Sequence, residues 1–178
     1  MSLATRVSRI AVAATLAAVS GAAHAQAGPH SRAGPWFSGG LAYQRACYTQ
    51  FSQHCLGGPA LGLGLGRALN GTVQVGIGST GLLSWSEVED QLDVGGSLTG
   101  VVRVHPIARH GLVLTGGLGI GSILLTPDRV GLAAEAGVGY DVRLGPHASL
   151  TPYLGVLRIG DRYRPTTYRQ LGLALTLD

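Results

Sequence analysis

The stretch LGLGLG at residues 61–66 has a leucine at every second position and a glycine at each position between. Because successive side chains of a β-strand point to opposite faces, this run has one aliphatic wall and one wall almost without side chains. The stretch LGLALTL at residues 171–177 repeats the pattern. Such an alternation is typical of a strand in a sheet with one apolar face.

The same two-residue period recurs along the chain and predicts eight strands. We expect them at residues 36–45, 56–67, 72–84, 92–105, 112–124, 130–144, 149–159 and 168–177. Tight connections built on Asn, Gly and Pro, at residues 68–71, 106–111 and 145–148, alternate with connections at 46–55, 85–91, 125–129 and 160–167. This order indicates an all-β, antiparallel up-and-down sheet.

Composition decides which wall of this sheet faces outward. Only 12% of the residues are charged, whereas an ordinary soluble domain has about 25%. With the aliphatic wall inside, the exterior would consist of Gly, Ala, Ser and Thr, which is a poor surface toward water. With the aliphatic wall outside, hydrocarbon covers it and closure of the sheet satisfies the backbone. We therefore predict a closed transmembrane β-barrel of eight strands.

The first residues predict export. Arg6 and Arg9 precede a short apolar stretch that ends in Ala23-His24-Ala25, the pattern that a signal peptidase accepts. We expect residues 1–25 to be a cleaved signal peptide, residues 26–35 a flexible periplasmic lead-in, and residues 36–178 the barrel, located in the outer membrane. The formal net charge of +4 is mild and the basic residues are scattered, so no nucleic-acid partner is expected.

Charged residues in the strands are expected to line the lumen. Parity assigns an inward position to Asp93, Arg103, Glu135, Asp141, Arg143 and Arg158. Charges in a narrow lumen must pair, because an isolated buried ion is costly. Extrapolation of the strand register from the turn near Pro146 places Glu135 beside Arg158 and predicts an ion pair between them. Asp141 and Arg143 are expected to join Arg103 in a second cluster. These charges are interpreted as filling and cross-linking the lumen, with a gated ion path as the alternative.

Two features lie at the predicted outer end of the barrel. Cys47 and Cys55 fall in the first outer connection, and export to an oxidising compartment predicts a disulfide between them. Metal binding by these thiols with His54 is the weaker alternative. Basic residues also gather at this end and are suited to the phosphates of anionic outer-leaflet lipids, or to simple exposure in solvated loops. They are Arg45, Arg129, Arg162, Arg164 and Arg169.

The chain resembles the small eight-stranded outer-membrane barrels of the OmpA and OmpX type. The resemblance rests on the opening GPWFSGGL at residues 34–41, the alternating strands, and the closing run at residues 171–177. It implies insertion by the barrel-insertion machinery, for which such families typically end in an aromatic residue, whereas this sequence ends in Leu177-Asp178. It also implies short periplasmic turns and longer outer loops.

These observations predict a non-enzymatic barrel with a structural, envelope-stabilising or surface-interaction role, without cofactor or metal, whose surface ligand the sequence does not identify. A soluble exported ligand-binding barrel is one alternative. A lipid A-modifying enzyme is another, because His147-Ala148-Ser149 is similar to the His-x-Ser element of outer-membrane deacylases. This tripeptide falls on a predicted periplasmic turn, far from the outer leaflet, which argues against catalysis.

Overall fold

The computed structural model describes residues 34–48, 54–86, 91–107, 110–122, 130–160 and 165–178. All regular structure in these residues is β. The strands are β1 (Gly34–Tyr48), β2 (His54–Ala68), β3 (Val73–Ser86), β4 (Gln91–Val104), β5 (Leu112–Ser122), β6 (Val130–Tyr140), β7 (Val142–Gly145), β8 (Ala148–Gly160) and β9 (Thr166–Leu177). No helix among the described residues is long and apolar enough to cross a membrane.

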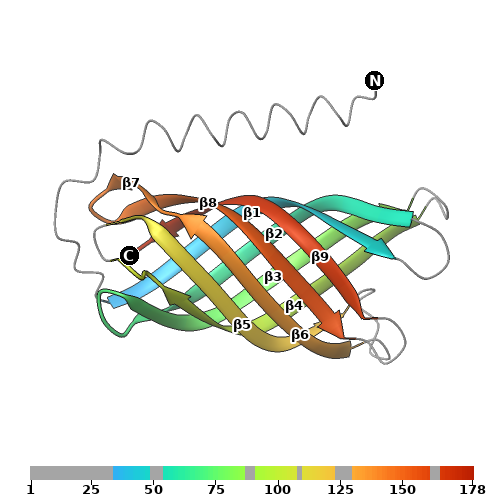
Figure 1. Cartoon of the computed structure of the whole chain (residues 1–178), viewed down its shortest axis with the longest axis horizontal. Helices are drawn as coiled ribbons and strands as arrows, with labels where there is room; N and C mark the ends of the chain where they lie inside the picture. Colours follow the sequence, from blue (N-terminus) through green and yellow to red (C-terminus); the bar gives the residue numbers. More distant parts are fainter. Residues whose placement is uncertain (1–33, 49–53, 87–90, 108–109, 123–129, 161–164) are drawn as a thin grey trace, which may run out of the picture.

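The strands form one closed antiparallel barrel (Figure 1). Strands that follow one another in the sequence pair with each other, except β6 and β7, and β1 pairs with β9 to close the ring. β7 continues the line of β6 beyond Asp141, and both pair with β8, so together they form one interrupted barrel strand. The nine labelled strands therefore make an eight-stranded barrel, which confirms the predicted fold class.

The predicted strands are all present, and the main difference lies in the first hairpin. β1 continues to Tyr48 and β2 begins at His54, so residues 46–48 and 54–55 of the predicted connection 46–55 are paired strand. The ladder places Cys47 directly opposite Cys55. The side chains of both cysteines lie outside those that the structure describes, so the disulfide stays a prediction. The predicted signal peptide lies outside the described residues, as does the lead-in before Gly34.

The outer wall of the barrel is aliphatic. Alternate residues of each strand expose large apolar side chains, and the most exposed are Leu132 (78%), Leu118 (75%) and Leu41 (66%). The wall continues through leucines, valines and isoleucines of the other strands. The prediction that the aliphatic face points outward is therefore confirmed.

The inner wall carries small and polar side chains along its length and a compact apolar cluster in one half. The cluster contains Ala46, Ala60, Leu82, Ala133, Leu157, Ile159 and Tyr168. Leu157 and Ile159 are fully buried. Figure 1 shows the tight turns and the C-terminus at the left-hand end of the barrel. The apolar cluster lies in the opposite half.

A charge on the outer wall distinguishes a barrel in hydrocarbon from one in water. Leu118 lies near the middle of β5, so Leu118→Arg is expected to lower the free energy of unfolding in lipid vesicles by about 2–4 kcal/mol. Leu69→Arg, at an exposed position in a tight turn, is the control and should change stability by less than about 0.5 kcal/mol. Urea titration of the vesicle-inserted protein measures both variants. Equal, small effects would contradict a lipid-facing wall.

The register of β1 and β2 gives a prediction for the two cysteines. Closing the nine-residue span from Cys47 to Cys55 is expected to stabilise the barrel by about 2.5 kcal/mol. The double variant Cys47→Ser/Cys55→Ser should lose this stability, and the reduced wild type should match the double variant. Alkylation followed by mass spectrometry reports the bond directly. Full labelling of both thiols without reductant would contradict the prediction.

Candidate functional site

A buried ionic network closes the lumen at the end of the barrel that carries the tight turns. Its centre is Asp141, which interrupts the strand between β6 and β7 and is 4% exposed. Thr151 donates a hydrogen bond of 2.6 Å to Asp141 Oδ1, and His105 Nε2 lies 3.0 Å from Asp141 Oδ2. The backbone N–H of Asp141 donates to the carbonyl of Gly111. The carboxylate therefore ties together segments that lie on different sides of the barrel.

Arg103 on β4 is the main cation of this network. It is 8% exposed, and both Asp141 and Asp178 attract it electrostatically. Its Nη1 donates a hydrogen bond of 3.3 Å to Thr176 Oγ1, and its Cζ lies 5.3 Å from the centre of the Trp36 ring. The guanidinium thus combines charge, hydrogen-bond and cation–π contacts, which offset the cost of its burial.

Two glycines make room for the Trp36 ring. A Cβ atom at Gly76 would lie 2.7 Å from Trp36 Cζ2, and one at Gly66 would lie 2.9 Å from Cε2. Neither position therefore accommodates a side chain beside this ring. The glycine wall that the sequence shows on β2 and β3 is the surface on which the indole packs, and the indole in turn supports Arg103.

The predicted cluster of Arg103, Asp141 and Arg143 is only partly assembled. The structure brings Arg103 and Asp141 together. Arg143 on β7 instead has its Nη2 3.8 Å from Asp178 Oδ2 and donates a hydrogen bond to the carbonyl of Pro146. His147 Nδ1 lies 3.0 Å from the main-chain oxygen of Asp178, so the end of β9 is held against the turn before β8.

The predicted Glu135–Arg158 ion pair is wrong. Arg158 is exposed on the outer wall and lies opposite Ala134, while Glu135 lies opposite Leu157. The cause is a β-bulge between Arg143 and Gly145, which shifts the register by one residue. Extrapolation from the turn, where Gly145 pairs with Ala148, gives the wrong partner for every residue beyond the bulge.

Glu135 instead faces a cavity of about 150 Å³ in the middle of the lumen. Thr99 donates a hydrogen bond of 3.0 Å to Glu135 Oε1. A Cβ at Gly117 would lie 2.7 Å from that oxygen, so the glycine leaves space for the carboxylate. Among the described residues no cation pairs with it. Other residues lining the cavity are Gly62, Gly64, Gly78, Arg103, Tyr153 and Gln170.

The ionic network also contains residues that were not predicted as site residues, among them His105, Thr151, Thr176 and Trp36. The alternation of side chains along a strand could have identified His105. It follows Arg103 by two positions and therefore faces the same side of the sheet. Trp36 and Thr151 give no such signal, because an aromatic or a threonine occurs on either wall of a barrel strand.

The network and the cavity carboxylate should respond differently to neutralisation. Asp141→Asn removes the carboxylate that attracts buried Arg103 most strongly, and we expect a loss of about 3 kcal/mol in the free energy of unfolding. Glu135→Gln keeps the oxygen that accepts from Thr99 and removes a charge that has no cationic partner among the described residues, so stability should change by less than about 0.5 kcal/mol. Urea unfolding in detergent measures both. A larger loss for Glu135→Gln would contradict this assignment.

Comparison with solved structures identifies the same architecture elsewhere. Neisserial surface protein A aligns with a TM-score of 0.60 and 11% identity, over 80% of this chain and 96% of that protein. The attachment invasion locus protein Ail of Yersinia pestis aligns with a TM-score of 0.50 and 14% identity, over 82% of this chain and 99% of Ail. No family model matches the sequence, and no curated protein matches it. The chain has the fold of the small eight-stranded outer-membrane β-barrels.

Proposed function

We propose that this protein is a small outer-membrane barrel with a structural or surface-interaction role and without catalysis. The observation that carries the proposal is the outward aliphatic wall on a closed strand ladder. In water such a wall would be a continuous exposed apolar surface, which soluble monomers avoid. In a bilayer it meets hydrocarbon, and the closed ladder gives each of the eight described barrel strands a partner on both sides, so the sheet closes on itself.

The lumen supports a structural role rather than a channel. The apolar cluster around Leu157 and Ile159 lies in one half of the lumen, and the ionic network around Asp141 lies at the end beside the tight turns. The cavity at Glu135 lies between these two groups. An eight-stranded barrel encloses only enough space for side chains, so both groups obstruct passage of a solute.

The arrangement at His147 and Ser149 argues against a lipid-modifying enzyme. Ser149 is 4% exposed on the inner wall of β8. His147 is exposed, and its Nδ1 lies within hydrogen-bond distance of the main-chain oxygen of Asp178. Both residues belong to the end of the barrel that carries the tight turns, which in this class faces the periplasm. A serine nucleophile needs a base within hydrogen-bond reach and an open approach for substrate.

A surface-interaction role is favoured by the position of the first hairpin. β1 extends to Tyr48 and β2 begins at His54, so the hairpin continues past Tyr43 and Leu61, the outermost large apolar side chains that the structure describes as exposed on these strands. Both proteins reported above carry names that refer to the cell surface or to attachment. A projecting outer hairpin is the part of such a barrel that an external partner meets first.

Extraction and conductance together test this proposal. The processed protein should remain in the membrane fraction, require detergent for solubility, and migrate differently on a denaturing gel before and after boiling. In a planar bilayer it should show no steady conductance. Free solubility without amphiphile would overturn the membrane assignment and favour the soluble binding barrel. A steady ion current would overturn the closed lumen while leaving the membrane assignment intact.

A further inference from the structure

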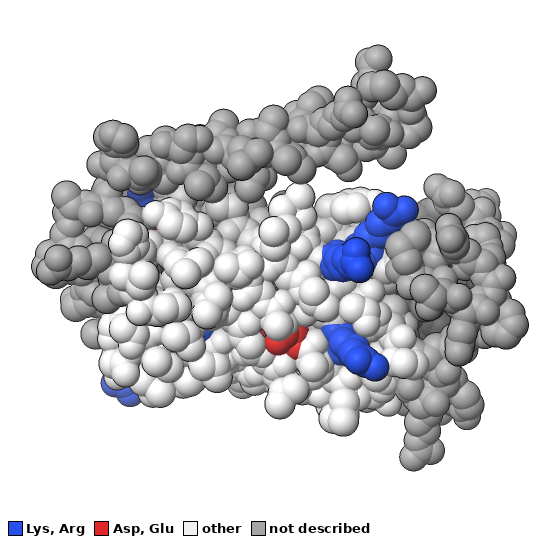
Figure 2. All heavy atoms as spheres, in the orientation of Figure 1, with Lys and Arg blue, Asp and Glu red and all other residues white. Residues whose placement is uncertain are grey.

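Three arginines project from the outer wall near the end opposite the tight turns: Arg45 on β1, Arg169 on β9 and Arg158 on β8. Arg45 lies directly opposite Arg169. Arg158 lies opposite Thr167, two positions from Val156, which is the partner of Arg169. Arg158 is therefore a diagonal neighbour of Arg169. We call these three residues the outer arginine cluster. Figure 2 shows arginine side chains toward the right-hand end of this face, with an acidic group nearer its middle and further arginine atoms toward the left-hand end.

The cluster lacks a counter-charge within the described part of the chain. None of its three arginines has a described hydrogen-bond or ion-pair partner there. Of the acidic side chains described, Glu135 and Asp141 point into the lumen and Asp178 lies at the other end. Like charges directly opposite each other across two strands are destabilising. An anion from outside the chain would convert this repulsion into attraction.

The height of the cluster on the barrel indicates where that anion lies. Arg67, at the opposite end, pairs with Pro35, and ten residue steps along β1 separate Pro35 from Arg45. With about 3.3 Å per residue and a tilt of about 40°, these steps span about 25 Å, the height of the apolar band in outer-membrane barrels. Between them the outward residues of β1 are Phe37, Gly39, Leu41 and Tyr43. The cluster thus lies at the outer boundary of the hydrocarbon.

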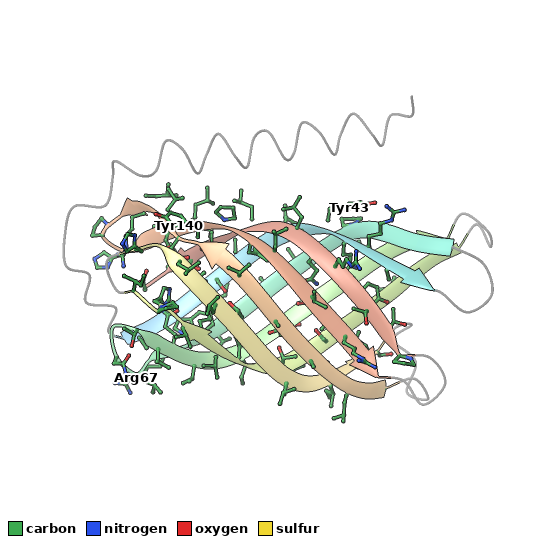
Figure 3. All side chains as sticks on the ribbon, in the orientation of Figure 1. Tyr43, Arg67 and Tyr140 are labelled. Atoms are coloured by element: carbon green, nitrogen blue, oxygen red, sulfur yellow. The ribbon has the colours of Figure 1, made fainter. Side chains whose placement is uncertain are left out.

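The surface beside the cluster suits an amphiphile. Val156 is 43% exposed and Leu154, one outward position further toward the middle of the barrel, is 58% exposed. Tyr43 is 59% exposed just below Arg45, and Figure 3 shows it near the same end, with Arg67 and Tyr140 toward the other. Aromatic rings of this kind mark the membrane interface. A ligand here meets apolar surface on one side and guanidinium groups on the other.

We propose that the outer arginine cluster binds the phosphate groups of an anionic lipid of the outer leaflet. The inference rests on the proposed outer-membrane location. A guanidinium group presents a planar fork of N–H donors that matches phosphate oxygens in pairs, and three such groups on adjacent strands can hold two phosphates or one phosphate from several sides. The acyl chains then pack along Val156 and Leu154, which are continuous with the aliphatic wall.

The test compares Arg45→Gln/Arg158→Gln/Arg169→Gln with the wild type and with Arg67→Gln, which removes an exposed outward arginine at the other end of the barrel. Each protein is folded in dodecyl maltoside micelles and titrated with lipid A that carries both phosphates. The dissociation constant is measured by calorimetry. The triple variant should bind at least tenfold more weakly, and Arg67→Gln should lie within twofold of the wild type. Enzymatically dephosphorylated lipid A should bind the wild type at least tenfold more weakly.

Several outcomes would overturn the inference. Unchanged binding by the triple variant, or an equal loss in Arg67→Gln, would show that the cluster is not the site. Binding of inorganic phosphate, or of heparin, as tightly as the lipid would assign the cluster to another anion. The gel shift between unheated and boiled samples separates this inference from the proposed function. A triple variant that keeps the shift and keeps its lipid affinity contradicts only the inference, whereas a wild type without the shift contradicts the proposed function.

Discussion

The structure depends on the closure of its backbone ladder. In hydrocarbon an unpaired N–H or C=O group costs several kcal/mol, because no water is present to satisfy it. The pairing of β1 with β9 and of β6 with β8 removes both free edges of the sheet. In a sheet without free edges, each strand side chain faces either the lumen or the outside of the barrel. The two-residue period of the sequence assigns each side chain to one of these two faces.

The lumen then has to be filled without a conventional hydrophobic core. One half uses aliphatic packing around Leu157 and Ile159. The other uses Arg103 and Asp141, whose burial is offset by Thr151, Thr176, His105 and the Trp36 ring. Because these partners come from β1, β4, β8, β9 and the break between β6 and β7, the network links strands that are not neighbours in the sheet. Backbone pairing fixes adjacent strands, and the network braces the ring across its diameter.

The architecture could be predicted from the sequence because it follows from a period that repeats in every strand. Strand number, closure and the outward direction of the aliphatic wall all depend on parity, which a single substitution does not disturb. The partner of Glu135 could not be predicted, because it depends on one additional residue at the bulge near Leu144. That residue moves Arg158 from the lumen to the outer wall. Trp36 shows the same limit, since its inward position follows only from the exact start of β1.

The glycines opposite the leucines have a consequence for how such a barrel can change over time. Gly62 lines the cavity, and a Cβ there would have the carbonyl oxygen of Gly40 as its nearest neighbour at 4.0 Å, while the adjacent Leu61 faces outward. The side chains of the lumen and those of the outer wall thus occupy separate, alternating positions in the sequence. At Gly62 a new side chain can therefore enter unoccupied interior volume without altering a group on the outer wall. The molecule is in this sense a scaffold whose chemistry is free to evolve independently of its anchoring.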